Sequence, residues 1–288
     1  MIKINSPIFS RTEIFDSCMA GIGDPNLQDL YRTQFNNLSI ECDIYHQLAQ
    51  SEQLFQYPAS NENNDTAILG RITKSQLKNL YTQYLSAKEK PARRYYDQIK
   101  LSAPQNICPY CGIGEVKTLD HYLPKAKFPI FSIYHNNLVP ACRDCQSEKM
   151  TDYAQNHTSQ TLHPYYDRAE YFSAMWLFAD ISENSWPSVE YRATPPDYLT
   201  TPVKQRIITH FSEYNLADRY SVQAGPALSD LFFILKPMRG NKNLINDHLL
   251  STAVAMRQAH INSWRAALYE ALGNNDWYCR EGHTQSPI

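Results

Sequence analysis

The sequence lacks any long apolar run. Nowhere in its 288 residues do about 20 consecutive apolar residues occur, which is the length that a membrane-spanning helix needs. Residues 1–7 also lack the apolar core of a secretory signal peptide. These absences predict a cytoplasmic protein that has no membrane partner. The net charge of −2 excludes a general excess of positive charge, so any affinity for nucleic acid must come from local patches.

The cysteine pattern argues against a disulfide framework. The chain has seven cysteines, an odd number, and four of them form two Cys-x-x-Cys pairs, Cys108 with Cys111 and Cys142 with Cys145. Two such pairs supply four thiolates, a ligand set that zinc takes up in tetrahedral structural sites. The sequence therefore predicts one structural Zn²⁺ ion bound by these four cysteines. The alternative is that the two pairs are redox-active or incidental.

Apolar periodicity divides the chain into three regions. Residues 1–103 and 171–288 carry apolar residues at helical spacing, most clearly over 27–48, 74–84, 92–101, 202–214 and 243–272. Residues 104–170 are rich in proline, so short strands and loops are expected there, with a short helix after Cys145. The pattern predicts a mostly helical protein with a small central region.

Positive charge is concentrated immediately before the first cysteine pair. Residues 71–100 contain eight basic and two acidic side chains, with four tyrosines interleaved among them. A stretch of this kind can be a solvated helix face, or it can follow a phosphate backbone. Its position directly before the first cysteine pair, next to the polar segment between the two pairs, favours the second interpretation.

A polar motif between the two cysteine pairs resembles the HNH endonucleases. The cysteine-bearing branch of this family reads Cys-Pro-x-Cys-Gly, then Asp-His-x-x-Pro, then Asn-Leu-x-x-x-Cys-x-x-Cys-Asn-x-x-Lys. Over residues 108–149 the chain matches this pattern at Cys108, Cys111, Gly112, Asp120, His121, Pro124, Asn137, Leu138, Cys142, Cys145 and Lys149. The resemblance implies a mostly helical α+β fold, in which a small ββα-metal core with the zinc site is inserted between helical N- and C-terminal regions.

The resemblance also implies roles for three residues. His121 resembles the general base that takes a proton from the water attacking a scissile phosphate. Asp120 resembles a ligand of a catalytic divalent ion, Mg²⁺ or Mn²⁺, and Asn137 resembles the residue that pins the loop and holds the histidine ring. The chemistry is suitable, because an imidazole can accept a proton near neutral pH and a hard cation prefers carboxylate oxygen.

One position departs from the family pattern. Nine residues after Asn137 the family usually carries His or Asn, and this chain carries Gln146. A glutamine carbonyl can still reach a hard cation, but it brings no charge. We therefore expect either Gln146 or another group to complete the divalent-ion site with Asp120, with His163 as the leading candidate for that other group and His135 as the next.

Several basic side chains in and before this segment are candidates for contact with nucleic acid. Phosphate contacts of this type supply affinity without sequence readout. The candidates are Arg93, Arg94, Lys125, Lys127, Arg143 and Lys149.

These features together predict a metal-dependent endonuclease that hydrolyses phosphodiester bonds, with DNA preferred to RNA on the family resemblance. Within the family, the chain is similar to nuclease subunits of Septu-type and retron-associated antiphage systems, which implies an effector subunit that works with an ATPase partner. Two alternatives remain open at this stage. One is a zinc-stabilised nucleic-acid-binding module without catalysis, and the other is a scaffold subunit.

Overall fold

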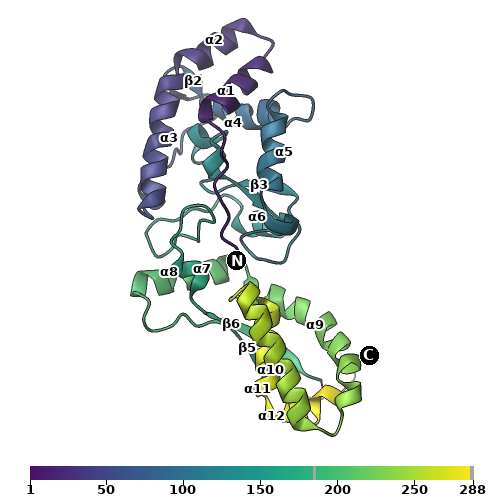
Figure 1. The fold of residues 1–288 in the computed structure, drawn as a ribbon. Helices are drawn as coiled ribbons and strands as arrows, with labels where there is room; N and C mark the ends of the chain where they lie inside the picture. Colours follow the sequence, from purple (N-terminus) through teal and green to yellow (C-terminus); the bar gives the residue numbers. More distant parts are fainter. Residues whose placement is uncertain (184–185, 286–288) are drawn as a thin grey trace. The chain divides into compact units, whose positions relative to one another are not determined.

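The computed structural model describes residues 1–183 and 186–285, and the chain divides into two compact units (Figure 1). The first unit is Ile2–Asp167, and the second is Arg168–Ile288 together with Met1. The boundary expected at residue 170 lies close to the observed one. Residues 2–103, expected as a separate region, belong to the same unit as the cysteine pairs.

The first unit is mainly helical and has two small hairpins. Its helices are α1 (Arg11–Ala20), α2 (Pro25–Thr33), α3 (Phe35–Gln50), α4 (Lys74–Asn79), α5 (Arg93–Leu101) and α6 (Arg143–Lys149). A π-helical stretch, η2 (Leu80–Leu85), follows α4 directly, and the 3-10 turns are η1 (Leu54–Gln56), η3 (Pro104–Asn106), η4 (Pro129–Phe131) and η5 (His135–Asn137). The strands are β1 (Ala67–Leu69), β2 (Ile72–Thr73), β3 (Thr118–His121) and β4 (Leu138–Ala141).

Side-chain caps define where two of these helices begin. The Ser10 hydroxyl accepts the Glu13 backbone N–H at the start of α1, and the Glu13 carboxylate accepts the Ser10 N–H in return. Thr73 and Gln76 form the same reciprocal pair at the start of α4. Each pair satisfies N–H groups that have no partner inside the helix, so the local sequence specifies these starts.

A hairpin followed by a helix forms the centre of the first unit. β3 and β4 are antiparallel, with Asp120 opposite Val139 and His121 opposite Leu138. All four residues of β4 are buried, and α5 packs against both strands. Since α5 is part of the basic stretch 71–100, the N-terminal helices share one core with the cysteine-bearing segment.

The second unit combines helices with one hairpin. Its helices are α7 (Glu170–Ser173), α8 (Thr201–Glu213), α9 (Leu216–Ile234), α10 (Lys242–Ala259), α11 (Trp264–Asn274) and α12 (Asp276–Arg280), with 3-10 turns η6 (Lys236–Met238) and η7 (Gly282–Thr284). Strands β5 (Leu177–Ser182) and β6 (Ser188–Ala193) pair antiparallel, and α11 and α9 pack against them. The hairpin was not expected in a region that we predicted to be helical.

The predicted helices are confirmed in outline. The pattern over residues 243–272 is divided between α10 and α11, because Ser263 starts a new helix by accepting the Ala266 N–H. The mostly helical α+β class is also confirmed. In the described ranges 1–183 and 186–285, every helix is too short or too polar to traverse a lipid bilayer.

Candidate functional site

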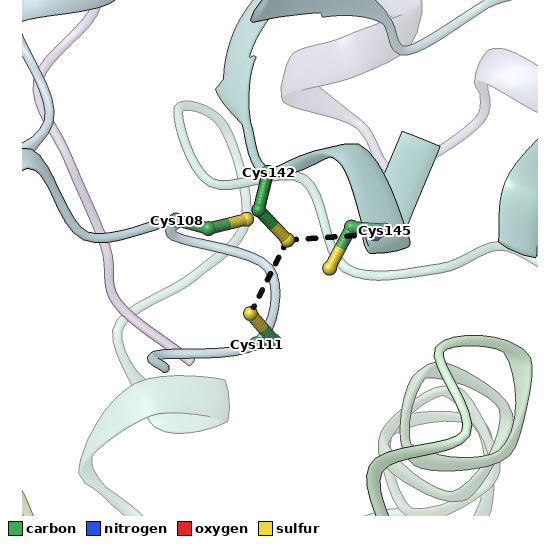
Figure 2. Close-up of side chains that lie close together, drawn as sticks. All are labelled: Cys108, Cys111, Cys142 and Cys145. Atoms are coloured by element: carbon green, nitrogen blue, oxygen red, sulfur yellow. Dashed lines mark hydrogen bonds between the residues drawn. The ribbon is translucent and has the colours of Figure 1, made fainter. Parts of the chain in front are cut away.

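The four paired cysteines meet in one buried cluster (Figure 2). The first pair sits on a tight turn, where the Gly112 N–H donates to the Cys108 carbonyl at 2.8 Å and φ of Gly112 is +71°. The second pair opens α6, where the Cys142 side chain caps the helix by accepting the Cys145 N–H at 3.4 Å. A turn and a helix start therefore present two sulfurs each to the same point.

The cluster fits a zinc ion. Its sulfur atoms all lie within 4.8 Å of one another, and Cys111 Sγ is 3.8 Å from Cys142 Sγ. Four ligands at about 2.3 Å from a tetrahedral zinc ion are separated by about 3.8 Å, so little movement is needed. A Cβ at Gly114 would lie 2.6 Å from Cys142 Sγ, which explains why glycine stands there.

The four thiols of the cluster affect one another's pKa values. A hydrogen bond from Cys108 lowers the pKa of Cys142 to about 7, whereas burial raises the pKa of Cys108. A bound cation would favour the thiolate form of all four sulfurs. The predicted structural zinc site is confirmed to the extent that these four residues can hold the ion.

His121 is the last residue of β3, in the β3–β4 hairpin, and its side chain is buried. Its Nε2 lies 2.9 Å from the carbonyl oxygen of Ser132. Because a carbonyl only accepts hydrogen bonds, Nε2 carries the proton, and the neutral ring keeps its lone pair on Nδ1. Burial lowers the pKa of His121 to about 3, the Ser132 bond opposes this, and the ammonium groups of Lys125 and Lys149 lower it further. The ring is therefore neutral at pH 7.

Asp120 forms a buried ion pair. Lys149 Nζ donates to Asp120 Oδ2 at 2.6 Å and to the His121 carbonyl at 2.6 Å, and the Tyr110 hydroxyl donates to the same Oδ2 at 3.2 Å. Burial lowers the pKa of Lys149, and the attraction of Asp120 opposes the effect. The prediction that Lys149 contacts nucleic acid is wrong, because its side chain is buried. The Lys149 ammonium group points into the interior, where it pairs with the buried Asp120 carboxylate.

Asn137 connects the two sides of the β3–β4 loop. Its Oδ1 accepts the Leu123 N–H at 2.7 Å, and its Nδ2 donates to the carbonyls of Leu123 at 3.0 Å and Phe131 at 3.3 Å. The side chain is fully buried. The carbonyl of Ser132, next to Phe131, is the one that accepts from His121. The position agrees with the loop-pinning role expected for Asn137.

The two ring nitrogens of His163 are bound to groups other than Asp120. His163 Nδ1 accepts the Tyr165 N–H at 3.2 Å, and His163 Nε2 lies 3.1 Å from the Tyr45 hydroxyl. Both nitrogens are thus engaged, so the expectation that His163 ligates a divalent ion is corrected. Gln146 is half-buried on α6, one turn before Lys149. Among the described residues, only the four cysteines bring three or more His, Cys, Asp or Glu side chains together.

His135, the second alternative ligand, lies in a separate buried position. Its ring packs against Tyr134, and Nδ1 is buried without a hydrogen-bond partner among the described residues. Burial lowers the pKa of His135 to about 4, and Arg11 lowers it further. Within residues 1–183 and 186–285, no metal-binding group of His, Cys, Asp or Glu side chains includes this ring, so His135 stays outside the site.

The other basic candidates differ in how strongly they are engaged. Lys125 is half-buried, and its Nζ lies 4.6 Å from the centre of the Tyr81 ring, which itself packs edge-on against His121 with ring centres 4.4 Å apart. Lys127 donates to Asn61 Oδ1 at 2.8 Å. Lys125 and Lys149 are therefore the predicted contact residues that lie near His121, and of these two Lys125 is the less buried.

Three arginines lie elsewhere in the unit. Arg93 pairs with Asp97 at 3.0 Å and lies over the Tyr96 ring, so it supports α5. Arg94 on α5 and Arg143 at the start of α6 are exposed. The last two remain available for contact with a polyanion.

Three tyrosines of the site were not predicted. Tyr45 comes from α3, Tyr81 from η2 and Tyr110 from the first cysteine turn, and their hydroxyls or rings contact Asn137, His121 and Asp120 respectively. The chain contains 20 tyrosines, and only Tyr110 is marked by its place between two cysteines. Nothing in the sequence distinguishes Tyr45, since its partner is 92 positions away.

Comparison with known proteins gives one relative. No family model and no solved structure matches the chain. Protein ea31 of Escherichia phage lambda is 30% identical to it over 295 residues, an alignment that covers 97% of this chain and 99% of ea31. The similarity therefore extends over both units and is not limited to the segment that contains the two cysteine pairs.

Proposed function

The chain belongs to the protein ea31 family, and we propose that it is an endonuclease of the HNH type that hydrolyses phosphodiester bonds, with DNA as the preferred substrate. The observation that carries the proposal is the state of His121. This imidazole is neutral, its Nε2 proton is held by the Ser132 carbonyl, and its lone pair is therefore on Nδ1. A histidine in this state can act as a general base.

The proposed reaction begins with a water molecule beside His121. Nδ1 takes a proton from this water, the remaining hydroxide attacks the phosphorus atom, and the bond to the leaving oxygen breaks. In the free protein burial lowers the pKa of His121, and the nearby lysines lower it further, so the imidazole is a weak base. A bound phosphodiester carries negative charge, and it would raise this pKa because it favours the imidazolium form.

Lys125 is the group that we assign to the phosphate itself. It lies over the Tyr81 ring that also contacts His121, and burial together with Lys78 lowers its pKa. A partly buried ammonium group loses water contacts, so a phosphate oxygen is a favourable partner for it. The exposed Arg94 and Arg143 would contribute weaker, salt-dependent contacts with the rest of the backbone.

We further propose that a divalent ion, Mg²⁺ or Mn²⁺, would neutralise charge on the phosphate and the leaving oxygen. Asp120 and Gln146 would be the protein ligands of this ion. Mg²⁺ is commonly held by one or two carboxylates together with substrate phosphate, so a small ligand set is sufficient. Lys149 and Tyr110 both bind Oδ2 of Asp120, which leaves Oδ1 for the ion.

At the level of the cell, we propose that the enzyme is an effector subunit of an antiphage defence system and acts with an ATPase partner. The support is the resemblance of its motif to the nuclease subunits of such systems. The second unit, whose described residues contribute none of the site residues discussed above, would be the part that contacts the partner.

The direct test is cleavage of supercoiled plasmid by the purified full chain with Mg²⁺ or Mn²⁺. His121→Ala should lower the rate by about 10²- to 10⁴-fold, which is the usual contribution of a general base. His135→Ala is the matched control, because it removes another buried neutral histidine of the same unit. Both variants should keep their zinc.

Two results would count against the proposal. Equal cleavage by the wild type and by His121→Ala would reject His121 as the base. Retained DNA binding without cleavage, with the ATPase partner also present, would favour a zinc-stabilised nucleic-acid-binding module instead.

A further inference from the structure

A buried chain of hydrogen bonds runs from His163 to the β3–β4 loop, and its direction can be assigned. The Tyr165 N–H donates to His163 Nδ1 at 3.2 Å, so the proton of the neutral ring is on Nε2. This Nε2–H points to the Tyr45 oxygen at 3.1 Å. The Tyr45 hydroxyl in turn donates to Asn137 Oδ1 at 3.1 Å, which is closer than its 3.5 Å contact with the Asn136 carbonyl. Every proton in the chain thus points towards Asn137.

From Asn137, the connection to His121 runs through the backbone of Phe131 and Ser132. With Oδ1 oriented by Tyr45 and by the Leu123 N–H, the Asn137 amide group must present Nδ2 to the Phe131 carbonyl at 3.3 Å. The next carbonyl, that of Ser132, accepts the Nε2–H of His121 at 2.9 Å. The position of the Phe131 and Ser132 backbone therefore depends on the orientation of the Asn137 amide group.

The groups in this chain are shielded from water. Tyr45 and Asn137 are 0% exposed and His163 is 1% exposed. The Tyr45 ring packs edge-on against Phe131 with ring centres 4.9 Å apart, and the His163 ring lies against Tyr122 at 4.1 Å. A buried hydrogen bond that is lost cannot be replaced by water, so removing one hydroxyl here perturbs its neighbours.

From this geometry we propose that Tyr45 and His163 are positioning residues that set the tautomer of His121. They hold Asn137, and through it the Ser132 carbonyl, where that carbonyl keeps the His121 proton on Nε2 and the lone pair on Nδ1. The consequence for catalysis rests on the proposed function, because only a base needs the lone pair on that nitrogen. The tautomer itself is a property of the protein without substrate.

The experiment reads the two ring nitrogens of His121 directly. The zinc-loaded full chain, labelled with ¹⁵N in its histidines, is measured by NMR, and His121→Gln assigns the signals. In the wild type, Nε2 should have the shift of a protonated nitrogen and Nδ1 that of an unprotonated one. In Tyr45→Phe, both shifts should move towards intermediate values, because the two tautomers then exchange.

Tyr31→Phe is the matched control. It also removes a buried tyrosine hydroxyl of the first unit, which donates to the Gln76 carbonyl at 2.8 Å, but it lies outside the chain. His121 shifts that are unchanged in Tyr45→Phe, as they should be in Tyr31→Phe, would overturn the proposal. Since no cleavage is measured, this outcome is distinct from a failure of the proposed function.

A second pair of variants covers the case in which Tyr45→Phe does not fold. His163→Gln keeps an N–H donor that can reach Tyr45, whereas His163→Leu removes it, and zinc content reports that each variant is folded. The His121 shifts should stay near wild type in the first and become intermediate in the second. If cleavage is present, His163→Leu should also lower kcat about tenfold with little change in KM. Identical His121 shifts in the two variants would overturn the proposal.

Discussion

Each unit of the chain contains a buried asparagine whose side-chain amide holds backbone groups in place, but the segments that the two asparagines hold differ. In the first unit, Asn137 ties the two sides of a loop together through its amide group. In the second, the Asn262 amide holds a single segment, residues 174–177, because its Oδ1 accepts the Trp176 and Leu177 N–H groups and its Nδ2 donates to the Ala174 carbonyl. The loop held by Asn137 carries the carbonyl that orients His121. The amide bridge alone therefore says nothing about function, which depends on what the loop contacts.

The units also differ in the buried polar groups that they contain. In the described part of the chain, the second unit buries Arg206, His210, Asn262 and His283, whereas the first buries twelve polar or charged side chains, including Asp120, His121, Asn137, Lys149 and His163. Burying polar groups costs stability unless each is paired. In the first unit, part of this cost falls around a neutral imidazole and a buried ion pair, as expected of a site built for chemistry.

The largest expected difference between the units concerns metal. Cys108→Ser should release zinc and make residues 104–150 sensitive to protease, because a structural zinc site contributes on the order of 10 kcal/mol to folding. Cys279→Ser in the second unit is the control, since a serine hydroxyl can donate to the same Leu272 and Gly273 carbonyls. Zinc analysis and limited proteolysis measure the outcome. Continued protection of residues 104–150 in Cys108→Ser would show that zinc does not hold this segment.

A smaller difference is expected between a buried and an exposed ion pair. Lys149→Met leaves the buried Asp120 carboxylate unpaired and should lower the free energy of unfolding by about 3–5 kcal/mol. Adding Asp120→Asn to this variant should restore much of the loss. Lys242→Met, which removes an exposed partner of Asp276, should have no measurable effect. Denaturant titrations compare the variants, and similar losses for Lys149→Met and Lys242→Met would contradict the role of the buried pair.

The last difference, which builds up gradually with each pH unit, is expected in the response to pH. The pKa of His121 is about 3 and that of His135 about 4 in the folded protein, against about 6.5 when unfolded. Below pH 6.5 the unfolded chain therefore takes up protons that the folded chain does not. Stability present above pH 6.5 is lost as the pH falls towards 4, by up to about 1.4 kcal/mol per pH unit for each histidine.

His121→Gln and His135→Gln test this response. Each variant should lose less stability than the wild type between pH 6.5 and 4, as measured by thermal unfolding at a series of pH values. A pH dependence identical to that of the wild type would mean that these rings are protonated in the folded chain.

The motif predicted many residues of the candidate site, but few of the hydrogen bonds and ion pairs that these residues form. The cysteine spacing located the four-cysteine cluster, and the Asp-His pair and Asn137 lie in the same hairpin and its loop. The sequence did not show that Lys149 points inward or that His163 binds Tyr45, since both depend on which groups are buried together. The motif contained Lys149, but a lysine in a sequence is equally compatible with a surface contact and with a buried pair.

Amino-acid order by itself determined the features that rest on short-range geometry. The two Cys-x-x-Cys turns, the capped starts of α1 and α4, and the placement of Asp120 and His121 on one strand all involve residues a few positions apart. Tertiary structure decided everything that links distant residues, such as Tyr45 with Asn137 and His163, or Lys149 with Asp120. The physical reason is that a buried polar group takes whichever partner the packing brings to it, and packing is a property of the whole unit.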